Sequence, residues 1–549
     1  MIKRRLLITT LTLLVYGSIF GQKFTFIKDI NPNLNGDSKP SFFINFNKKL
    51  IFAAQNATSN MEPWQTDGTS SGTTMIRELN SSGSSITTKT SSFNILGSSL
   101  YFIADDGNGN DLWVTDDTYN GTVKVKDINS GASGIGGLTI FKSKLYFYAN
   151  DGTNGTELWV SDGTASGTKM LKDINSGSGS SNPSQLTVCG SYLFFVANDG
   201  STGNEVYASD GTAAGTFQMA DIKLGSASSN PKYLTNNNGK CYFQADDGNV
   251  GSELWVSDGT SSGTKLVKDI NSGGSSSPSN MFSFNNKLYF DANDGTHGIE
   301  LYVSDGSSKG TTLVKDINSG SGNSSPNNYI IYNSKLFFSA NDGTHGIELW
   351  STDGSSGGTS MVKDLNSGSN SSYPSALTNY GGCIYYVAND GTHGVQLVMT
   401  DGTDTGTHVY LNPSATQTNP MTSATQLALY NGSLYFASGA DSNGIELWSF
   451  YAPLRTGINM PVEAGMSMRL YPNPNSGNEL HVQWDAKEDA NLTIVITCMD
   501  GKEIYRTVAP HAAAEFTVML PSQIKNGLYL VSIQGNHEKV TQKLLIQRN

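Results

Sequence analysis

The chain has 549 residues, too many for one ordinary compact core, so several domains or an array of repeats are expected. Its net charge of −12 argues against nucleic acid as a partner, because phosphate backbones are bound by clustered lysine and arginine. The four cysteines show no CxxC spacing and no close pairing, so neither a disulfide scaffold nor a cysteine zinc site is supported.

The first segment, residues 1–21, is typical of a cleavable signal peptide. A basic start, KRR, precedes an apolar run that ends at Phe20, and the small residue Gly21 follows. The alternative is a membrane anchor, but the run is shorter than the roughly 20 apolar residues needed to cross hydrocarbon. No later segment is apolar enough to span a bilayer, so a secreted mature chain without a transmembrane segment is expected.

Residues 22–451 form a repeat array. The large residue of an ELW-type triplet recurs every 46 to 50 positions, at Trp64, Trp113, Trp159, Tyr207, Trp255, Tyr302, Trp350, Val398 and Trp448. This period fits a four-stranded propeller blade, for which about 40–50 residues are usual. We expect these large residues to fill the space between neighbouring sheets and not to bind a ligand.

One copy, Lys144–Asn175, shows why the unit must be β. Its apolar runs at Leu145–Tyr148, Leu158–Val160 and Met170–Leu171 are of strand length and are separated by Asp-Gly and Gly-Thr turn signals. A fourth strand is placed after a Ser/Gly-rich loop, as at Gln185–Val188. In the turns, glycine supplies positive φ and the aspartate side chain closes an Asx turn.

The last repeat, Gln426–Phe450, lacks the strand that contains KDI in other copies. The segment FTFIKDI at Phe24–Ile30 matches that strand, so it is predicted to complete the final sheet and to close a ring. The sequence therefore predicts an all-β fold with a β-propeller of nine four-stranded blades. Eight blades is the alternative, because Pro63 lies inside a strand of the first copy and could displace it.

The motifs ELWVSDGTASGT (Glu157–Thr168) and ELWVSDGTSSGT (Glu253–Thr264) resemble those of the ELWxxDGT repeat family of bacterial exported proteins. The resemblance covers residues 24–451 and implies a repeat architecture and an extracellular setting, without a defined activity. Three copies depart from the motif, at Asp116-Asp117, at Glu205-Val206-Tyr207 and at Gln396-Leu397-Val398.

After a linker at residues 452–466, residues 467–549 show strand-like runs typical of a small Ig-like β-sandwich. Their motifs resemble those of the type A C-terminal sorting domain of the type IX secretion system, on Tyr471, Pro472, Asn473, Pro474, Gly527, Tyr529 and Lys543. The resemblance implies recognition by the outer-membrane translocon, followed by release or anchoring at the outer cell surface. A plain Ig-like adhesion module is the alternative.

The repeats offer little for catalysis. A sialidase-like site needs several arginines, but Arg77 is the only arginine between residues 24 and 451. The glutamates that could form a hydrolase pair recur at one repeat position, whereas a catalytic centre is unique: Glu62, Glu157, Glu205, Glu253, Glu300, Glu348 and Glu446. No catalytic residues are therefore predicted.

Metal sites are also weakly indicated. His297, His345 and His393 recur within NDGTHG, and equivalent turns are too far apart for one zinc ion. Calcium is the one cofactor that the turns could hold, through the carboxylates of Asp151, Asp199, Asp247, Asp294, Asp342 and Asp390. Asx turns are the alternative explanation for these aspartates.

The sequence thus favours a secreted or cell-surface protein that acts as a non-catalytic binding, adhesion or structural module, with an extracellular glycan or protein as its ligand. The alternative is a secreted polysaccharide-degrading enzyme, a propeller glycosidase or lyase, that uses a non-repeated carboxylate such as Asp37 or Asp404.

Overall fold

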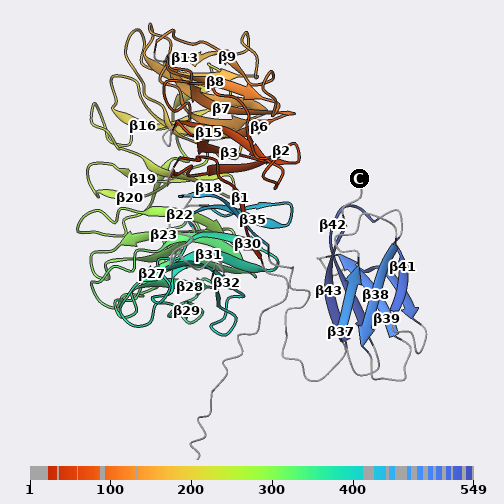
Figure 1. The fold of residues 1–549 in the computed structure, drawn as a ribbon. Helices are drawn as coiled ribbons and strands as arrows, with labels where there is room; N and C mark the ends of the chain where they lie inside the picture. The colour runs from red at the N-terminus through yellow and green to blue at the C-terminus, as the bar shows by residue number, and fades with distance from the viewer. Residues whose placement is uncertain are drawn as a thin grey trace, which may run out of the picture. The chain divides into compact units, whose positions relative to one another are not determined.

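The computed structural model describes residues 23–33, 36–58, 60–86, 93–131, 133–411, 426–439, 444–451, 467–471, 479–485, 492–498, 503–509, 515–520, 524–534 and 539–546. The chain divides into two compact units, Met1–Ala452 and Pro453–Asn549 (Figure 1). The predicted signal peptide and linker lie outside the described residues.

Among the described residues of the first unit, the strands form nine four-stranded sheets, numbered here in chain order. Sheet 1 consists of β2 (Ser41–Phe46), β3 (Lys49–Gln55), β4 (Met61–Thr66) and β5 (Thr74–Met75). Sheet 2 consists of β6 (Asn94–Leu96), β7 (Ser99–Asp105), β8 (Asn110–Thr115) and β9 (Val123–Lys126). Sheet 3 consists of β10 (Gly136–Phe141), β11 (Lys144–Asn150), β12 (Thr156–Ser161) and β13 (Lys169–Lys172).

Sheet 4 consists of β14 (Ser184–Cys189), β15 (Tyr192–Asn198), β16 (Asn204–Ser209) and β17 (Thr216–Gln218). Sheet 5 consists of β18 (Lys232–Asn237), β19 (Lys240–Asp246), β20 (Ser252–Ser257) and β21 (Lys265–Lys268). Sheet 6 consists of β22 (Ser279–Phe284), β23 (Lys287–Asn293), β24 (Ile299–Ser304) and β25 (Thr312–Lys315).

Sheet 7 consists of β26 (Asn327–Tyr332), β27 (Lys335–Asn341), β28 (Ile347–Thr352) and β29 (Ser360–Lys363). Sheet 8 consists of β30 (Ser375–Tyr380), β31 (Cys383–Asn389), β32 (Val395–Thr400) and β33 (His408–Tyr410). Sheet 9 consists of β34 (Ala428–Tyr430), β35 (Ser433–Ser438), β36 (Glu446–Tyr451) and β1 (Lys23–Lys28). The three copies that depart from the motif also form four-stranded sheets.

The prediction that the leading segment completes the last sheet is confirmed. β1 pairs antiparallel with β36, with Phe24 opposite Phe450 and Phe26 opposite Trp448. The Phe24 and Phe450 rings lie 4.7 Å apart, and those of Phe26 and Trp448 lie 5.3 Å apart. Residues more than 400 positions apart therefore share one sheet, which covers the edge of β36.

The alternative in which Pro63 displaces the first copy is not what the structure shows, because β2 to β5 form a four-stranded sheet. Pro63 lies within β4, opposite Ala53 of β3. The Pro63 carbonyl accepts the Ile76 N–H at 2.9 Å, so Pro63 directs its backbone polar groups toward the segment of β5. Because proline has no N–H, this segment receives one hydrogen bond fewer from β4. β5 has two residues, where most sheets have a four-residue fourth strand, so the missing donor shortens the last strand and leaves the sheet in place.

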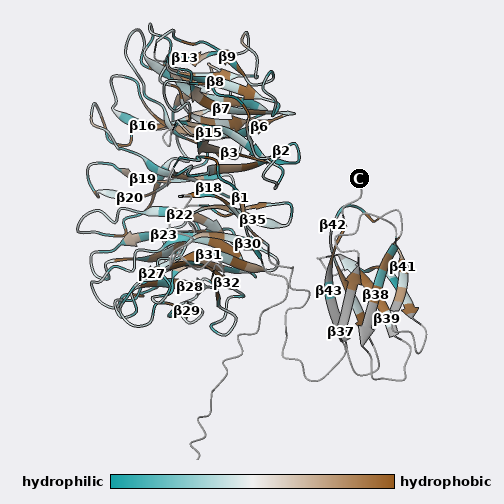
Figure 2. Ribbon diagram, in the orientation of Figure 1, coloured by the Kyte–Doolittle hydropathy of each residue, from teal (hydrophilic) through white to brown (hydrophobic). Residues whose placement is uncertain are grey.

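Large side chains pack between successive sheets. Trp159 of sheet 3 lies in a cluster with Tyr101, Ile103 and Leu112 of sheet 2, and Trp350 of sheet 7 lies with Leu301 of sheet 6. The other members of the repeat position lie in equivalent clusters: Trp64, Trp113, Tyr207, Trp255, Tyr302, Val398 and Trp448. Figure 2 shows that the hydrophobic residues concentrate in the strands. Burial of these side chains in close contact stabilises each interface.

At six places in the described part of the chain, a lysine latch joins the outer strand of one sheet to the turn of the following sheet. The ammonium group of Lys126 donates to the Thr168 carbonyl at 2.7 Å, and Lys315 donates to the Thr359 carbonyl at 2.8 Å. Each acceptor belongs to the turn of the following sheet. This contact gives a structural role to the lysine of the repeated KDI sequence, which the sequence alone did not reveal.

Sheet 9 meets sheet 1 through the contacts that join sheets within the array. Lys28 donates to the Thr73 carbonyl at 2.9 Å, as in the other latches. The Tyr430 hydroxyl donates to the Lys48 carbonyl at 2.6 Å, and the equivalent Tyr380 donates to Gly432 at 2.6 Å. The last and first sheets are therefore neighbours in space.

The second unit contains two antiparallel sheets among its described residues. The first sheet has three strands, β37 (Ser467–Tyr471), β38 (Glu479–Asp485) and β41 (Glu515–Met519). The second has four, in the order β40 (Glu503–Ala509), β39 (Leu492–Cys498), β42 (Gly527–Gln534) and β43 (Lys539–Ile546). Leu480, Ile494, Val518, Val531 and Leu544 are fully buried in one cluster that both sheets share. This unit therefore has a hydrophobic core of its own.

Candidate functional site

The glutamates of the ELW triplets are buried carboxylates with structural partners. Glu157 is fully buried, and its Oε2 accepts the Ile174 N–H at 2.8 Å and the Ser181 hydroxyl at 2.6 Å. Its Oε1 accepts the Ser181 N–H at 2.8 Å. Each such carboxylate ties the loop that leads to the next sheet to its own sheet. Equivalent contacts surround Glu62, Glu205, Glu253, Glu300, Glu348 and Glu446.

Burial raises the pKa of each of these glutamates, although the hydrogen bonds oppose that effect. The effect is largest for Glu446, where burial raises the pKa to about 7. Raised pKa values are common in general acids, but each of these carboxyl groups is fully buried and already accepts structural hydrogen bonds through its Oε2 atom. They cannot reach a substrate in this conformation.

The second Asp-Gly turn, which the second and last copies lack, explains the DGTxxGT motif. Asp162 Oδ1 accepts the Thr164 N–H at 2.9 Å and the Thr164 hydroxyl at 2.7 Å, and these bonds lower the pKa of Asp162. Gly163 has φ +95°, and a Cβ atom at Gly167 would lie 2.0 Å from Asp162 Oδ1. Both glycines are therefore required by the turn.

The calcium candidates lie in Asx turns. Asp151 Oδ1 accepts the N–H groups of Thr153 and Asn154 at 2.9 and 2.8 Å, and its Oδ2 accepts the Asn154 amide at 2.7 Å. The other five accept the same pair of backbone N–H groups: Asp199, Asp247, Asp294, Asp342 and Asp390. Within the described part of the chain, no three His, Cys, Asp or Glu side chains form a group that could hold a metal ion.

The three repeated histidines each pair with the aspartate of their own turn and are not brought together. His297 Nδ1 lies 2.7 Å from Asp294 Oδ2, and His345 and His393 make the same contact with Asp342 and Asp390. This contact raises the pKa of His297 and of His345. The histidines thus reinforce the turn.

The two non-repeated carboxylates suggested for an enzyme are likewise bonded and lie in different sheets' loops. Asp37 Oδ1 accepts the Ile445 N–H at 2.9 Å, and Asp404 Oδ1 accepts the Lys363 ammonium at 2.8 Å. Asp404 belongs to the turn before β33, whereas Asp37 precedes β2.

Of the sorting-motif residues, Tyr471 lies in β37, Gly527 and Tyr529 lie in β42, and Lys543 lies in β43. Tyr529 is nearly buried, and its hydroxyl donates to the Lys525 carbonyl at 2.9 Å. Residues 472–474 lie outside the described residues.

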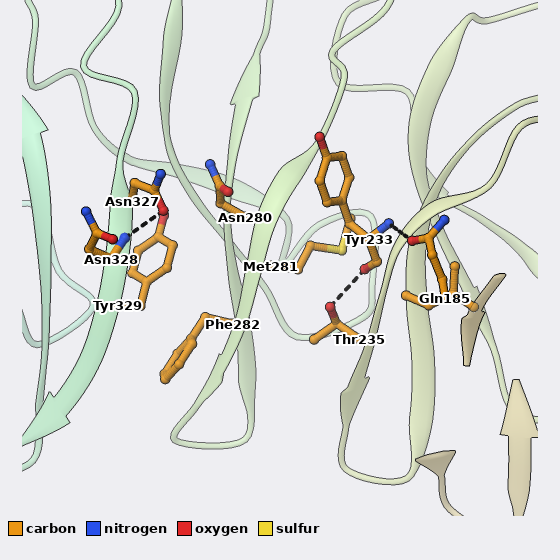
Figure 3. Close-up of a pocket in the computed structure, with 10 residues that line it drawn as sticks. Gln185, Tyr233, Thr235, Asn280, Met281, Phe282, Asn327, Asn328 and Tyr329 are labelled. Atoms are coloured by element: carbon orange, nitrogen blue, oxygen red, sulfur yellow. Dashed lines mark hydrogen bonds between the residues drawn. The ribbon is translucent and has the colours of Figure 1, made fainter. Parts of the chain in front are cut away.

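A hollow of about 460 Å³ lies along the first strands of sheets 4 to 7 (Figure 3). Gln185 of β14 borders it at one end and Asn327, Asn328 and Tyr329 of β26 at the other. Residues of the two middle strands line the rest: Tyr233, Leu234, Thr235, Asn280, Met281 and Phe282. None of these ten lining side chains carries a charge.

Four of the lining residues occupy one structural position, the second residue of the first strand. Gln185, Tyr233, Asn280 and Asn328 all have positive φ, from 49° to 59°. Each lies within a β-bulge at the start of its strand. Positive φ is uncommon for residues other than glycine and marks a position held by its surroundings.

Side chains at this position hold the next sheet. Gln185 Oε1 accepts the Tyr233 N–H at 2.6 Å, while Asn280 and Asn328 donate to the carbonyls of Pro326 and Pro374 at 3.4 and 3.0 Å. These residues were not predicted from the sequence, because the ELW and DGT positions recur from copy to copy and this position does not. The available signal was the variation at this position, which reads Gln, Tyr, Asn and Asn in four successive repeats.

Comparison with known proteins identifies the second unit. Residues 469–547 match the family of the secretion system C-terminal sorting domain, which confirms the predicted sorting domain. This match supports export of the chain through the type IX secretion system. None of the described residues forms a helix with the length and hydrophobicity of a membrane span.

No curated protein matches the chain. Among solved structures, it is similar to the β-propeller domain of the Trilobed protease from Pyrococcus furiosus, at 10% identity over 69% of this chain and 99% of that chain, with a TM-score of 0.34. A puromycin hydrolase matches at 11% identity over 65% and 59% of the two chains, with a TM-score of 0.34. A puromycin-hydrolyzing peptidase of Mycobacterium tuberculosis matches at 9% over 66% and 60%, with a TM-score of 0.35.

This chain spans about three fifths of the length of the two hydrolases. These similarities are too low to inform activity. The resemblance of residues 24–451 to the ELWxxDGT repeat family stays a prediction.

Proposed function

We propose that the chain is an exported, non-catalytic binding protein, whose nine sheets form one closed β-propeller and whose Ig-like second unit directs it through the type IX secretion system to the outer cell surface. Ring closure is supported by the contacts of sheet 9 with sheet 1, which repeat those within the array. A direct test is electron microscopy of the purified protein, in which views along the ring axis should show nine blades.

The binding role is supported by one observation above all. The hollow along β14, β18, β22 and β26 has uncharged walls, while the repeated glutamates are buried in structural hydrogen bonds. Hydrolysis of a glycosidic bond requires an accessible acid and a second carboxylate, and the hollow offers neither. A concave surface with a few polar groups and aromatic rings is suited to holding a ligand.

The role can be tested on living cells. Purified protein added to cells that lack the gene should be retained at their surface, and the same protein should release no product from a panel of extracellular polysaccharides. Lack of retention would contradict the binding role, and turnover of any polysaccharide would contradict the non-catalytic one.

A further inference from the structure

We propose that the hollow along β14, β18, β22 and β26 binds a neutral oligosaccharide, with the Tyr233 ring as a stacking platform and the amides of Asn280, Asn327 and Asn328 as partners for its hydroxyl groups. This inference rests on the proposed binding function and names its ligand class. In Figure 3 the phenol of Tyr233 and the amide of Asn280 both point toward the top of the view.

The absence of charged side chains from the lining of the hollow disfavours ionic ligands. Its lining contains amides, hydroxyls, a thioether and aromatic rings, and no lysine, arginine, histidine or carboxylate. A phosphate, a uronate or a sialic acid would lose its hydration there without gaining a cationic partner. Sugar hydroxyls need only hydrogen-bond donors and acceptors, which the lining supplies.

The amides are held in place before any ligand binds. Asn280 Nδ2 donates to Asp291 Oδ2 at 3.1 Å as well as to Pro326, and Asn328 Nδ2 donates to Ser339 Oγ at 3.2 Å as well as to Pro374. Their Oδ1 atoms therefore face a fixed direction as acceptors. Such preorganisation lowers the entropy cost of binding.

Asn327 complements these acceptors with a donor. Its Oδ1 accepts the Asn328 N–H at 2.7 Å, and within the described part of the chain no group accepts a hydrogen bond from its Nδ2. Asn327 is exposed on β26, so this donor is accessible to a ligand. Paired donors and acceptors along one surface fit the adjacent hydroxyl groups of a sugar ring.

Tyr233 supplies the apolar part of the contact. Its side chain is 44% exposed, although its backbone is fixed at φ 59° by the bond to Gln185 and by the Thr235 hydroxyl, which donates to the Tyr233 carbonyl at 2.8 Å. An exposed aromatic ring on a fixed backbone presents one face to a ligand. The Phe282 and Tyr329 rings, which pack 5.6 Å apart, add apolar surface elsewhere in the lining.

Calorimetric titration of the full chain tests the proposal. The probes are neutral hexasaccharides with glucose, mannose or xylose units, with an oligogalacturonate of the same length as the charged comparison. At least one neutral probe should bind, and the charged probe should not. Tyr233→Ala and Asn327→Ala should each weaken that binding by about tenfold, the loss expected for one stacking or hydrogen-bond contact.

Tyr373→Ala is the matched control, because Tyr373 is 64% exposed, has φ 52° and does not line the hollow. It should leave the affinity unchanged. Tyr233→Phe keeps the ring and should retain most of the affinity, which guards against misfolding of the alanine variant.

Absence of binding to every neutral probe, preference for the charged probe, or unchanged affinity in Tyr233→Ala would overturn the assignment. The cell-retention assay separates this failure from that of the binding function. If the wild-type chain is retained on cells and Tyr233→Ala is retained equally, the chain binds elsewhere, for example to a protein. If the wild-type chain is not retained, the binding function itself fails.

Discussion

Each ELW glutamate accepts hydrogen bonds from two segments that would otherwise end with buried donors. Replacing Glu157 by alanine leaves the N–H groups of Ile174 and Ser181 and the Ser181 hydroxyl without this acceptor. Since an unpaired buried donor costs about 1–3 kcal/mol, we expect Glu157→Ala to lower the free energy of unfolding by about 3 kcal/mol or more in urea titrations.

Glu78 provides the control for this prediction, because it is an exposed glutamate of the same array. Glu78→Ala should change stability by less than about 0.5 kcal/mol. Glu157→Gln keeps one acceptor oxygen, so its loss in free energy of unfolding should lie between those of Glu157→Ala and Glu78→Ala. Equal losses in Glu157→Ala and Glu78→Ala would show that the buried carboxylate contributes nothing particular.

The raised pKa of Glu446 makes stability depend on pH. Its folded-state pKa is about 7 and its ordinary value is 4.5, so the folded protein binds the proton more tightly. The stabilisation is fully present below pH 4.5 and is lost as the pH rises through 7. Over that window the group contributes on the order of 3 kcal/mol.

The melting temperature should therefore increase as the pH is lowered from 8 to 5, and the other ELW glutamates add to this trend. Below about pH 4 it should fall again, because the turn aspartates such as Asp162 have lowered pKa values and lose their stabilising charge. Glu446→Gln should flatten part of the rise between pH 8 and 5. If Glu446→Gln showed the same dependence of melting temperature on pH as the unchanged protein, Glu446 would not be a cause of the rise.

At the scale of the elements, β1 is the segment whose removal should matter most. Deletion of Lys23–Lys28 exposes the edge of β36 and removes the buried Ile27 and the ring contacts of Phe24 and Phe26. We expect a lower melting temperature and self-association in size-exclusion chromatography, because unpaired strand edges pair with other chains.

A synthetic peptide with the sequence of Lys23–Ile30 should restore the melting temperature of the deleted protein by binding to β36. The same peptide with Phe24 and Phe26 replaced by serine is the control, and it should not rescue. A deletion variant as stable as the full chain would mean that β1 contributes little to the last sheet.

The strands and turns could be predicted because their signals are local. Runs such as Leu158–Val160 lie between Asp-Gly turns, and the matching of Phe24–Ile30 to the KDI strand placed the chain start in the last sheet. The sequence left the place of Pro63 open, since a proline either disrupts a strand or occupies one whose N–H side faces a short neighbour. The hollow was missed because it combines side chains from four repeats, and the positive φ of Tyr233 has no glycine to signal it.

At the scale of the whole molecule, the two units have separate cores. The second core contains residues from β37 to β43 only, and the clusters of the first unit contain none of them. We therefore expect residues 23–451 expressed alone to melt at the same temperature as that unit in the full chain, measured by differential scanning calorimetry. In the native host, the same truncation should abolish export, with the protein accumulating inside the cell envelope.

Two controls sharpen this experiment. A truncated chain fused to residues 467–549 of the same protein should regain export, and a fusion to an unrelated β-sandwich should not. Export of the truncated chain without any fusion would contradict the role of the sorting domain.

The lysine latch has a consequence for how such arrays change over generations. Its acceptor is a main-chain carbonyl, as between Lys126 and Thr168, so the contact depends little on the side chains of the adjoining unit. Any copy with the lysine can thus make this contact with any following copy that has the turn. Recombination within the gene that adds or removes whole units would keep this one contact at the new junction, whatever side chains the neighbouring units carry.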